Sequence, residues 1–143
     1  MTGFGKFYLF TEDEKTYTGQ FYQGVMNGDG VIKTKNYIYK GYIKNGVANG
    51  FGCYEDLKTE VVYEGNFSMG KREGFGKEYN GENGYYMSEY EGFWLKDTRD
   101  GEGKLKRQKS PSQHIELIEG RWEQDVLKEI NRCTTLTQMS DFE

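Results

Sequence analysis

The sequence predicts an all-β protein: an elongated, single-layer, twisted antiparallel sheet of tandem β-hairpins, with a short C-terminal helix. The first observation behind this prediction is that glycine and aromatic residues recur at fixed offsets along most of the chain. The second is composition, because 12 Tyr, 9 Phe and 2 Trp outnumber 7 Leu, 6 Ile and 6 Val. Such a chain can cover an extended sheet with aromatic rings, but it has too few aliphatic residues for a bulky core.

Each repeat unit opens with a tyrosine and follows one pattern. Glycine stands two residues after the tyrosine, an apolar residue four after it, a turn residue seven after it, and glycines eleven and thirteen after it. Full units start at Tyr17, Tyr39, Tyr63 and Tyr90. Half units flank them, with Gly3 and Gly5 before the first full unit and residues 118–122 after the last. The array is therefore expected to occupy residues 1–122.

Each unit is expected to fold as a hairpin. Tyr-x-Gly-x-Phe/Trp has a period of two, so these side chains share one face of a strand. The residue seven after the tyrosine suits a turn with positive φ; it is glycine in three units, and Asp97 and Asp125 take its place later. The following Gly-x-Gly begins the return strand and leaves slots that a neighbouring ring can cover. Because one hairpin is marginal in water, stacked hairpins are expected to stabilise one another.

The aromatic positions of the units form an expected ladder of rings. They are Tyr17, Phe21, Tyr39, Tyr63, Phe67, Tyr90, Trp94 and Trp122. One interpretation is that these rings pack between the hairpins as the core. The other is that part of the ladder is an exposed groove that receives a partner segment, because a one-layer sheet cannot hide both of its faces. These eight residues are the first candidate binding site.

Two insertions lengthen the later units, near residues 79–88 and 104–114. The second contains the only basic run, which consists of Lys104, Lys106, Arg107 and Lys109. This run is interpreted either as a solvated loop or as an anionic contact, whose ligand would be a lipid headgroup or an acidic protein tail.

The segment after the array changes character. Val126, Leu127 and Ile130 recur at helical spacing, which predicts a short amphipathic helix over residues 123–134. The helix is interpreted either as a cap over the end of the sheet or as a docking element for a partner. Residues 135–143 are expected to be a flexible tail.

Several function classes are disfavoured by composition. The formal net charge of −4 argues against general nucleic-acid binding, and a single histidine argues against a His-based metal site or catalytic triad. No cofactor-binding or metal-binding pattern is found, so an enzyme is not expected and no cofactor is predicted. The two cysteines lie far apart and the N-terminus does not resemble a secretory signal, which indicates a reducing, cytoplasmic location.

The pattern resembles the MORN repeat (membrane occupation and recognition nexus). The matching segments are YTGQFYQGVMNGDG (17–30), YKGYIKNGVANGFG (39–52), YEGNFSMGKREGFG (63–76) and YEGFWLKDTRDGEG (90–103). The resemblance implies a non-enzymatic structural or adaptor protein of a large cytoskeletal or ciliary (axonemal) assembly, as in the radial spoke head. Its expected partners are other proteins of a multi-subunit assembly. The unpaired strand edges at the two ends of the array would be covered by such a partner or by a second copy bound end to end. The alternative that the resemblance implies is a membrane-surface or phosphoinositide-binding module that localises a partner enzyme.

Overall fold

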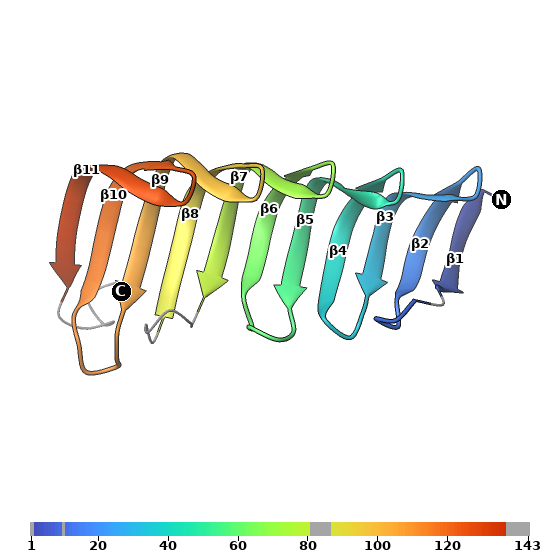
Figure 1. Ribbon diagram of the computed structural model, residues 1–143, viewed down its shortest axis with the longest axis horizontal. Coiled ribbons are helices and arrows are strands. Elements are labelled where there is room, and N and C mark those ends of the chain that lie inside the picture. Colours follow the sequence, from blue (N-terminus) through green and yellow to red (C-terminus); the bar gives the residue numbers. More distant parts are fainter. Residues whose placement is uncertain (1, 10, 81–86, 137–143) are drawn as a thin grey trace.

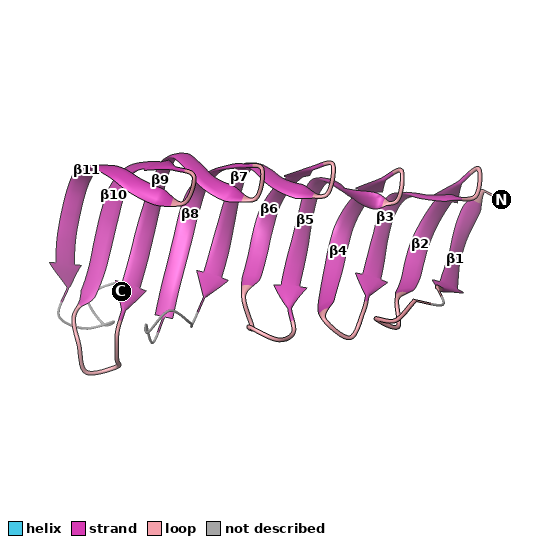
Figure 2. Ribbon diagram, in the orientation of Figure 1, coloured by secondary structure: helices cyan, strands magenta, loops and turns pink. Residues whose placement is uncertain are grey.

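The computed structural model describes residues 2–9, 11–80 and 87–136, which form a single antiparallel sheet of eleven strands. The strand order β1 to β11 follows the sequence, so each strand pairs with its neighbours in the chain. Figure 1 shows the strands side by side across a long array, with the hairpin turns along one edge and the links between hairpins along the other. Figure 2 shows only strands and loops in the described part of the chain. The expected elongated sheet is therefore confirmed.

The strands pair into the hairpins that the repeat predicts. They are β1 (Gly3–Tyr8), β2 (Thr16–Tyr22), β3 (Val25–Lys33), β4 (Tyr37–Lys44), β5 (Val47–Asp56), β6 (Val62–Ser68), β7 (Lys71–Asn80), β8 (Met87–Leu95), β9 (Thr98–Gln108), β10 (Ile115–Glu123) and β11 (Val126–Leu136). The four full units are the hairpins β2–β3, β4–β5, β6–β7 and β8–β9. Residues 81–86 of the first insertion, and residues 137–143 of the expected tail, lie outside the described residues.

The predicted C-terminal helix is wrong, because this segment forms strand β11 and completes a fifth hairpin with β10. Gln124 and Asp125 close its turn with φ values of 47° and 68°. Two irregularities shift the β10–β11 register, so the residues opposite Trp122, Gly120 and Ile118 are spaced by three instead of two. Those residues are Leu127, Ile130 and Cys133. The apparent helical period is thus a strand period stretched by β-bulges.

Each full unit is held together by its tyrosine, which lies over the glycine pair. In the third unit, the Tyr63 ring covers Gly65 and Gly76, and a Cβ added to Gly76 would collide with it. The register shifts between Gly65 and Phe67, and the Tyr63 hydroxyl donates a hydrogen bond of 2.8 Å to the carbonyl oxygen of Asn66 between them. The other full units repeat this bond at 2.7–3.0 Å from Tyr17, Tyr39 and Tyr90. The predicted ring slots are therefore confirmed.

Edge-to-face ring contacts join neighbouring hairpins. Phe67 lies between Tyr39 and Tyr63, with ring centroids 5.3 and 5.1 Å away. Trp94 lies in the same way between Tyr63 and Tyr90, at 5.3 Å from each. Such a contact contributes about 0.5–1.5 kcal/mol beyond the area that it buries. The core is thus a row of rings that each hairpin shares with the next.

The turns are connected from one hairpin to the next by backbone hydrogen bonds. The turn residue at the seventh offset donates its N–H to a carbonyl of the preceding hairpin. The pairs are Gly46 to Met26, Gly70 to Ala48, Asp97 to Arg72 and Asp125 to Arg99, at 2.8–3.1 Å. Asp97 keeps the positive φ of the glycine that it replaces, at 67°. Its carboxylate also accepts a hydrogen bond from the Arg72 backbone N–H at 2.8 Å, so aspartate strengthens this connection.

Candidate functional site on the aromatic face

The predicted ladder residues lie on one side of the sheet, here called the aromatic face. Seven of the eight are buried: Tyr17, Tyr39, Tyr63, Phe67, Tyr90, Trp94 and Trp122. Phe21 is half-buried, and its ring centroid lies 4.0 Å from that of Phe7. The rings therefore form the floor of this face and leave little surface of their own. Their role in binding a partner stays a prediction.

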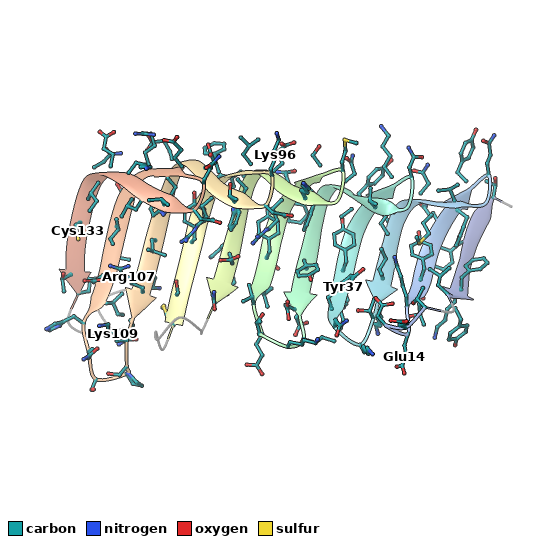
Figure 3. All side chains as sticks on the ribbon, viewed as in Figure 1. Glu14, Tyr37, Lys96, Arg107, Lys109 and Cys133 are labelled. Carbon is teal, nitrogen blue, oxygen red and sulfur yellow. The ribbon has the colours of Figure 1, made fainter. Side chains whose placement is uncertain are left out.

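Two adjoining hollows above this floor form a groove across strands β3 to β7. Their volumes are about 280 and 430 Å³, and both are lined by Tyr54, Phe67 and Gly70. We call this feature the aromatic-face groove. Its further lining includes Lys15, Ile32, Tyr37, Tyr39, Val47, Asp56, Tyr63, Arg72, Glu78 and Asp97. In Figure 3, Tyr37 lies on the sheet between Lys96 at the turn edge and Glu14 at the opposite edge.

The groove has an apolar floor and an acidic side. Tyr37 and Tyr54 extend the floor beyond the ladder, with their rings stacked at 5.2 Å between centroids. Arg72 is the cation at the acidic side, and its guanidinium contacts Glu78 at 2.6 Å and Asp97 at 3.3 Å. The Asp56 carboxylate accepts hydrogen bonds from two backbone N–H groups of its loop, which lower its pKa. This side of the groove thus carries more carboxylates than cations.

The tyrosine hydroxyls of the floor act as hydrogen-bond donors. Burial raises the pKa of three of them to about 12, namely those of Tyr39, Tyr63 and Tyr90. These hydroxyls are neutral at physiological pH and donate to backbone carbonyls. They serve the fold and supply neither a nucleophile nor a base to the groove.

The basic run lies mainly on strand β9, whereas the sequence placed it in an insertion loop. Lys104 and Arg107 lie opposite Glu119 and Glu116 of β10, with nitrogen-to-oxygen distances of 3.8 and 2.6 Å. Lys106 lies opposite Glu89 of β8. Figure 3 shows Arg107 on the sheet and Lys109 at the loop edge. Because carboxylates face the strand cations, the expected attraction for an anionic surface is reduced; the anionic contact stays a prediction.

The C-terminal candidates are placed differently from the prediction. Leu127 packs against the core cluster, whereas Val126 and Ile130 are 52% and 56% exposed. Val126 stands at the turn and Ile130 pairs with Gly120. These residues belong to the last hairpin of the sheet, and a docking role for them stays a prediction.

Sequence reasoning missed the groove residues outside the ladder. Tyr37 stands two residues before the ladder residue Tyr39, and Tyr54 stands two residues after Gly52, the last glycine of the same unit. Extending the period of two would therefore have placed both on the aromatic face. Arg72 could have been found from the repeat itself. In the third and fourth units, an arginine stands nine residues after the opening tyrosine, and the turn of the following hairpin carries aspartate. The resulting ion pairs are Arg72 with Asp97 and Arg99 with Asp125.

Over residues 2–9, 11–80 and 87–136, no three His, Cys, Asp or Glu side chains are grouped closely enough to hold a metal ion. Within the same residues, no helix with the length and apolar character of a membrane span is present.

Comparison with known proteins identifies the repeat. The family model described as the MORN repeat matches residues 17–37, 39–56, 63–82 and 90–109. Alsin from Rattus norvegicus is 31% identical over 128 residues, which cover 82% of this chain and 8% of Alsin. Human Alsin is 30% identical over 128 residues. MORN repeat-containing protein 3 from Xenopus laevis is 33% identical over 67 residues, covering 46% of this chain and 28% of that protein. The chain thus spans less than a tenth of the length of the Alsins that it matches.

Proposed function

We propose that this chain, which belongs to the MORN-repeat family, is a non-enzymatic adaptor that holds a segment of another protein in the aromatic-face groove. The MORN repeat is a non-catalytic module, and proteins that carry it bind other proteins or membranes. The observation that carries the proposal is the groove itself, which combines a continuous aromatic floor with an acidic side. A floor that is already packed within the sheet loses little conformational entropy when a partner binds.

The groove also indicates the chemistry of the partner segment. Apolar side chains would contact Tyr54 and Phe67 at the centre, where the two hollows meet. A lysine or arginine of the segment would then reach Asp56 and Asp97. We therefore infer a segment with apolar anchors and at least one basic residue.

The broader setting that we propose is a large cytoplasmic assembly of the cytoskeleton or of a cilium. An elongated array offers one groove along several hairpins, which suits a protein that joins subunits. The placement of the basic run favours this proposal over a membrane role, because its strand cations lie opposite carboxylates.

Val47→Lys tests the groove. Val47 lines it, is 44% exposed and follows a turn glycine, so lysine can be accommodated there without loss of the fold. Val126→Lys is the matched control, because Val126 occupies the equivalent position of the fifth hairpin and is 52% exposed. In proximity labelling in cells, Val47→Lys is expected to lose a defined set of neighbours that Val126→Lys keeps. Equal neighbour sets for the two variants would contradict binding in the groove.

The same experiment tests the setting. Neighbours that belong to the cytoskeleton or to a cilium are expected among those that Val47→Lys loses. If the lost neighbours are instead membrane proteins, and the protein floats with anionic liposomes, the membrane-surface alternative replaces the proposal.

A further inference from the structure

The side of the sheet opposite the aromatic face, here called the outer face, carries a row of exposed rings. The row consists of Tyr42, Phe51, Phe75 and Phe93, which are 43%, 67%, 46% and 49% exposed. Phe75 and Phe93 are cross-strand partners on β7 and β8, and their ring centroids lie 5.6 Å apart. Rings that are gathered on one face of adjacent strands mark an interaction surface rather than scattered exposure.

A row of charges runs beside these rings on the outer face. Each member is the cross-strand partner of the next, and the sign alternates over six successive strands from β6 to β11. The row is Glu64, Lys77, Glu91, Lys104, Glu119 and Arg132. It stands two residues from the aromatic row along β7 and β8, where Lys77 follows Phe75 and Glu91 precedes Phe93. Each row therefore runs across the strands at one position along the strand direction.

From these two rows, we infer that the outer face binds a second copy of this chain, face to face, with the two arrays running in opposite directions. The two-fold axis runs parallel to the strands and passes between β7 and β8. Strand β7 then faces β8 of the second copy, β6 faces its β9, and β5 faces its β10. Because the axis preserves position along the strands, Phe75 and Phe93 meet each other at the centre, and the central members of the charged row meet charges of opposite sign.

The central contacts of this arrangement are complementary. Phe75 faces Phe93 of the second copy, and Phe93 faces its Phe75. In the charged row, Lys77 faces Glu91 and Glu64 faces Lys104. Two-fold symmetry makes each of these contacts twice, as an isologous interface requires. Both Glu64 and Lys104 are exposed, and Lys104 is 73% exposed, so their side chains are accessible to the second copy.

The alternating charges select this arrangement over its competitors. A two-fold axis along the length of the array, at the level of the charged row, would place every strand on its own copy, so Lys77 would meet Lys77. An axis through β7 would repeat that repulsion. An axis between β8 and β9 would keep opposite charges together, but it would place Phe93 over Glu102. Specific interfaces use such repulsion against wrong pairings as well as attraction in the right one.

The available area is sufficient for a stable dimer. Strands β4 to β11 overlap in this arrangement, and eight strands at about 4.8 Å extend for roughly 38 Å. With about six residues per strand in contact, at about 3.4 Å each, the footprint is roughly 750 Å² per copy. Standard stable interfaces bury about 800 Å² per partner, and stacked sheets lie about 10 Å apart.

Charge reversal at one contact tests the inference without relying on loss of the fold. Sedimentation is measured from about 1 to about 100 µM, because the weaker interfaces of this size have dissociation constants in the micromolar range. The full chain is expected to form a dimer within this range. Glu64→Lys and Lys104→Glu each place like charges at both copies of one contact, so each variant alone is expected to dimerise at least about tenfold more weakly. An equimolar mixture is expected to recover the native dimer mass, because opposite charges then meet at both contacts.

Lys58→Glu is the control, because Lys58 is exposed in the loop between β5 and β6 and the substitution changes net charge as Lys104→Glu does. It is expected to leave dimerisation unchanged. A native chain that stays monomeric at about 100 µM overturns the inference. A mixture of the two reversed variants that stays monomeric overturns it as well. Val47→Lys in the groove is expected to remain dimeric, so this result is separable from failure of the proposed adaptor function.

Discussion

Removing one ladder hydroxyl tests how the tyrosines hold each hairpin together. Tyr63 is 1% exposed, and its hydroxyl donates to the Asn66 carbonyl oxygen at 2.8 Å, where the β6–β7 register shifts. Tyr63→Phe keeps the ring over Gly65 and Gly76 and removes only this bond. A hydrogen bond of this kind contributes about 0.5–1.5 kcal/mol, and about 1–3 kcal/mol when the remaining partner is left unpaired away from water. We expect the free energy of unfolding to fall by about 1–2 kcal/mol.

The assay is urea unfolding followed by tryptophan fluorescence. Trp94 contacts the Tyr63 ring and is 3% exposed, so its emission reports on the opening of this hairpin. Tyr8→Phe is the control, because Tyr8 is 65% exposed and should lose less than about 0.5 kcal/mol. If Tyr63→Phe is no more destabilising than Tyr8→Phe, the hydroxyl does not support the shifted register and the reasoning is wrong.

Three further outcomes are expected. Gly76→Ala should destabilise by about 1–3 kcal/mol in urea unfolding, because its Cβ would collide with the ring of Tyr63, whereas Gly24→Ala meets no atom within 4 Å and is opposed only by its φ of 77°. Asp97→Ala should lower the melting temperature more than Asp97→Gly. Both variants lose the carboxylate, but alanine is also strained by about 1–2 kcal/mol at a φ of 67°, whereas glycine is not. Alkaline pH should unfold the protein, because Tyr39, Tyr63 and Tyr90 have a pKa of about 12 when folded and near 10 when unfolded. Their contribution to the free energy of unfolding is therefore complete below pH 10 and is lost as the pH rises toward 12. Circular dichroism can follow this unfolding.

The sequence was sufficient to predict the four full hairpins, because each copy of the repeat contains the residues that shape its own hairpin. Tyr63, Gly65 and Phe67 lie on one face by the period of two, and Gly76 has to be glycine because the ring of Tyr63 lies over it. Each residue of the pattern thus performs a local task that can be read without knowledge of distant contacts. Four copies of the pattern then fix the strand order, since each hairpin can pair only with its neighbours in the chain.

The segment after Trp122 was misread because its glycines are missing. Glu129 and Asn131 occupy the offsets where the full units carry their Gly-x-Gly pair, and Ile118 replaces the tyrosine. Without the ring and its slots, the single wide shift of the other hairpins is replaced by two smaller ones. Periodicity alone cannot distinguish a strand with bulges at every third residue from a helix. The segment forms a strand because it pairs with the edge of β10, whose backbone N–H and C=O groups a helix would leave without partners.

The groove could be predicted only in part, because its shape depends on contacts between units. The floor follows from the ladder, but its acidic side depends on how Arg72 lies against Glu78 and Asp97. The position of the basic run likewise depends on how far β9 extends. At this end of β9, Arg107 pairs with Glu116 of the neighbouring strand, which lies outside the repeat unit that contains Arg107.

The division between the two faces has a consequence for how such an array acquires specificity. Tyr, Gly and the apolar position point to the aromatic face and are fixed by packing, whereas the residues between them point to the outer face and are free to vary. In the third unit these are Glu64 and Asn66, and in the fourth they are Glu91 and Phe93. Substitutions of Glu64 and Glu91 should change what the outer face binds while leaving the unfolding free energy within about 0.5 kcal/mol. Asn66 and Phe93 differ, because Asn66 donates a hydrogen bond to the Phe75 carbonyl oxygen and Phe93 contacts the Phe75 ring. Stability and recognition can therefore be altered separately in this sheet, because alternate residues of the same strand belong to different faces.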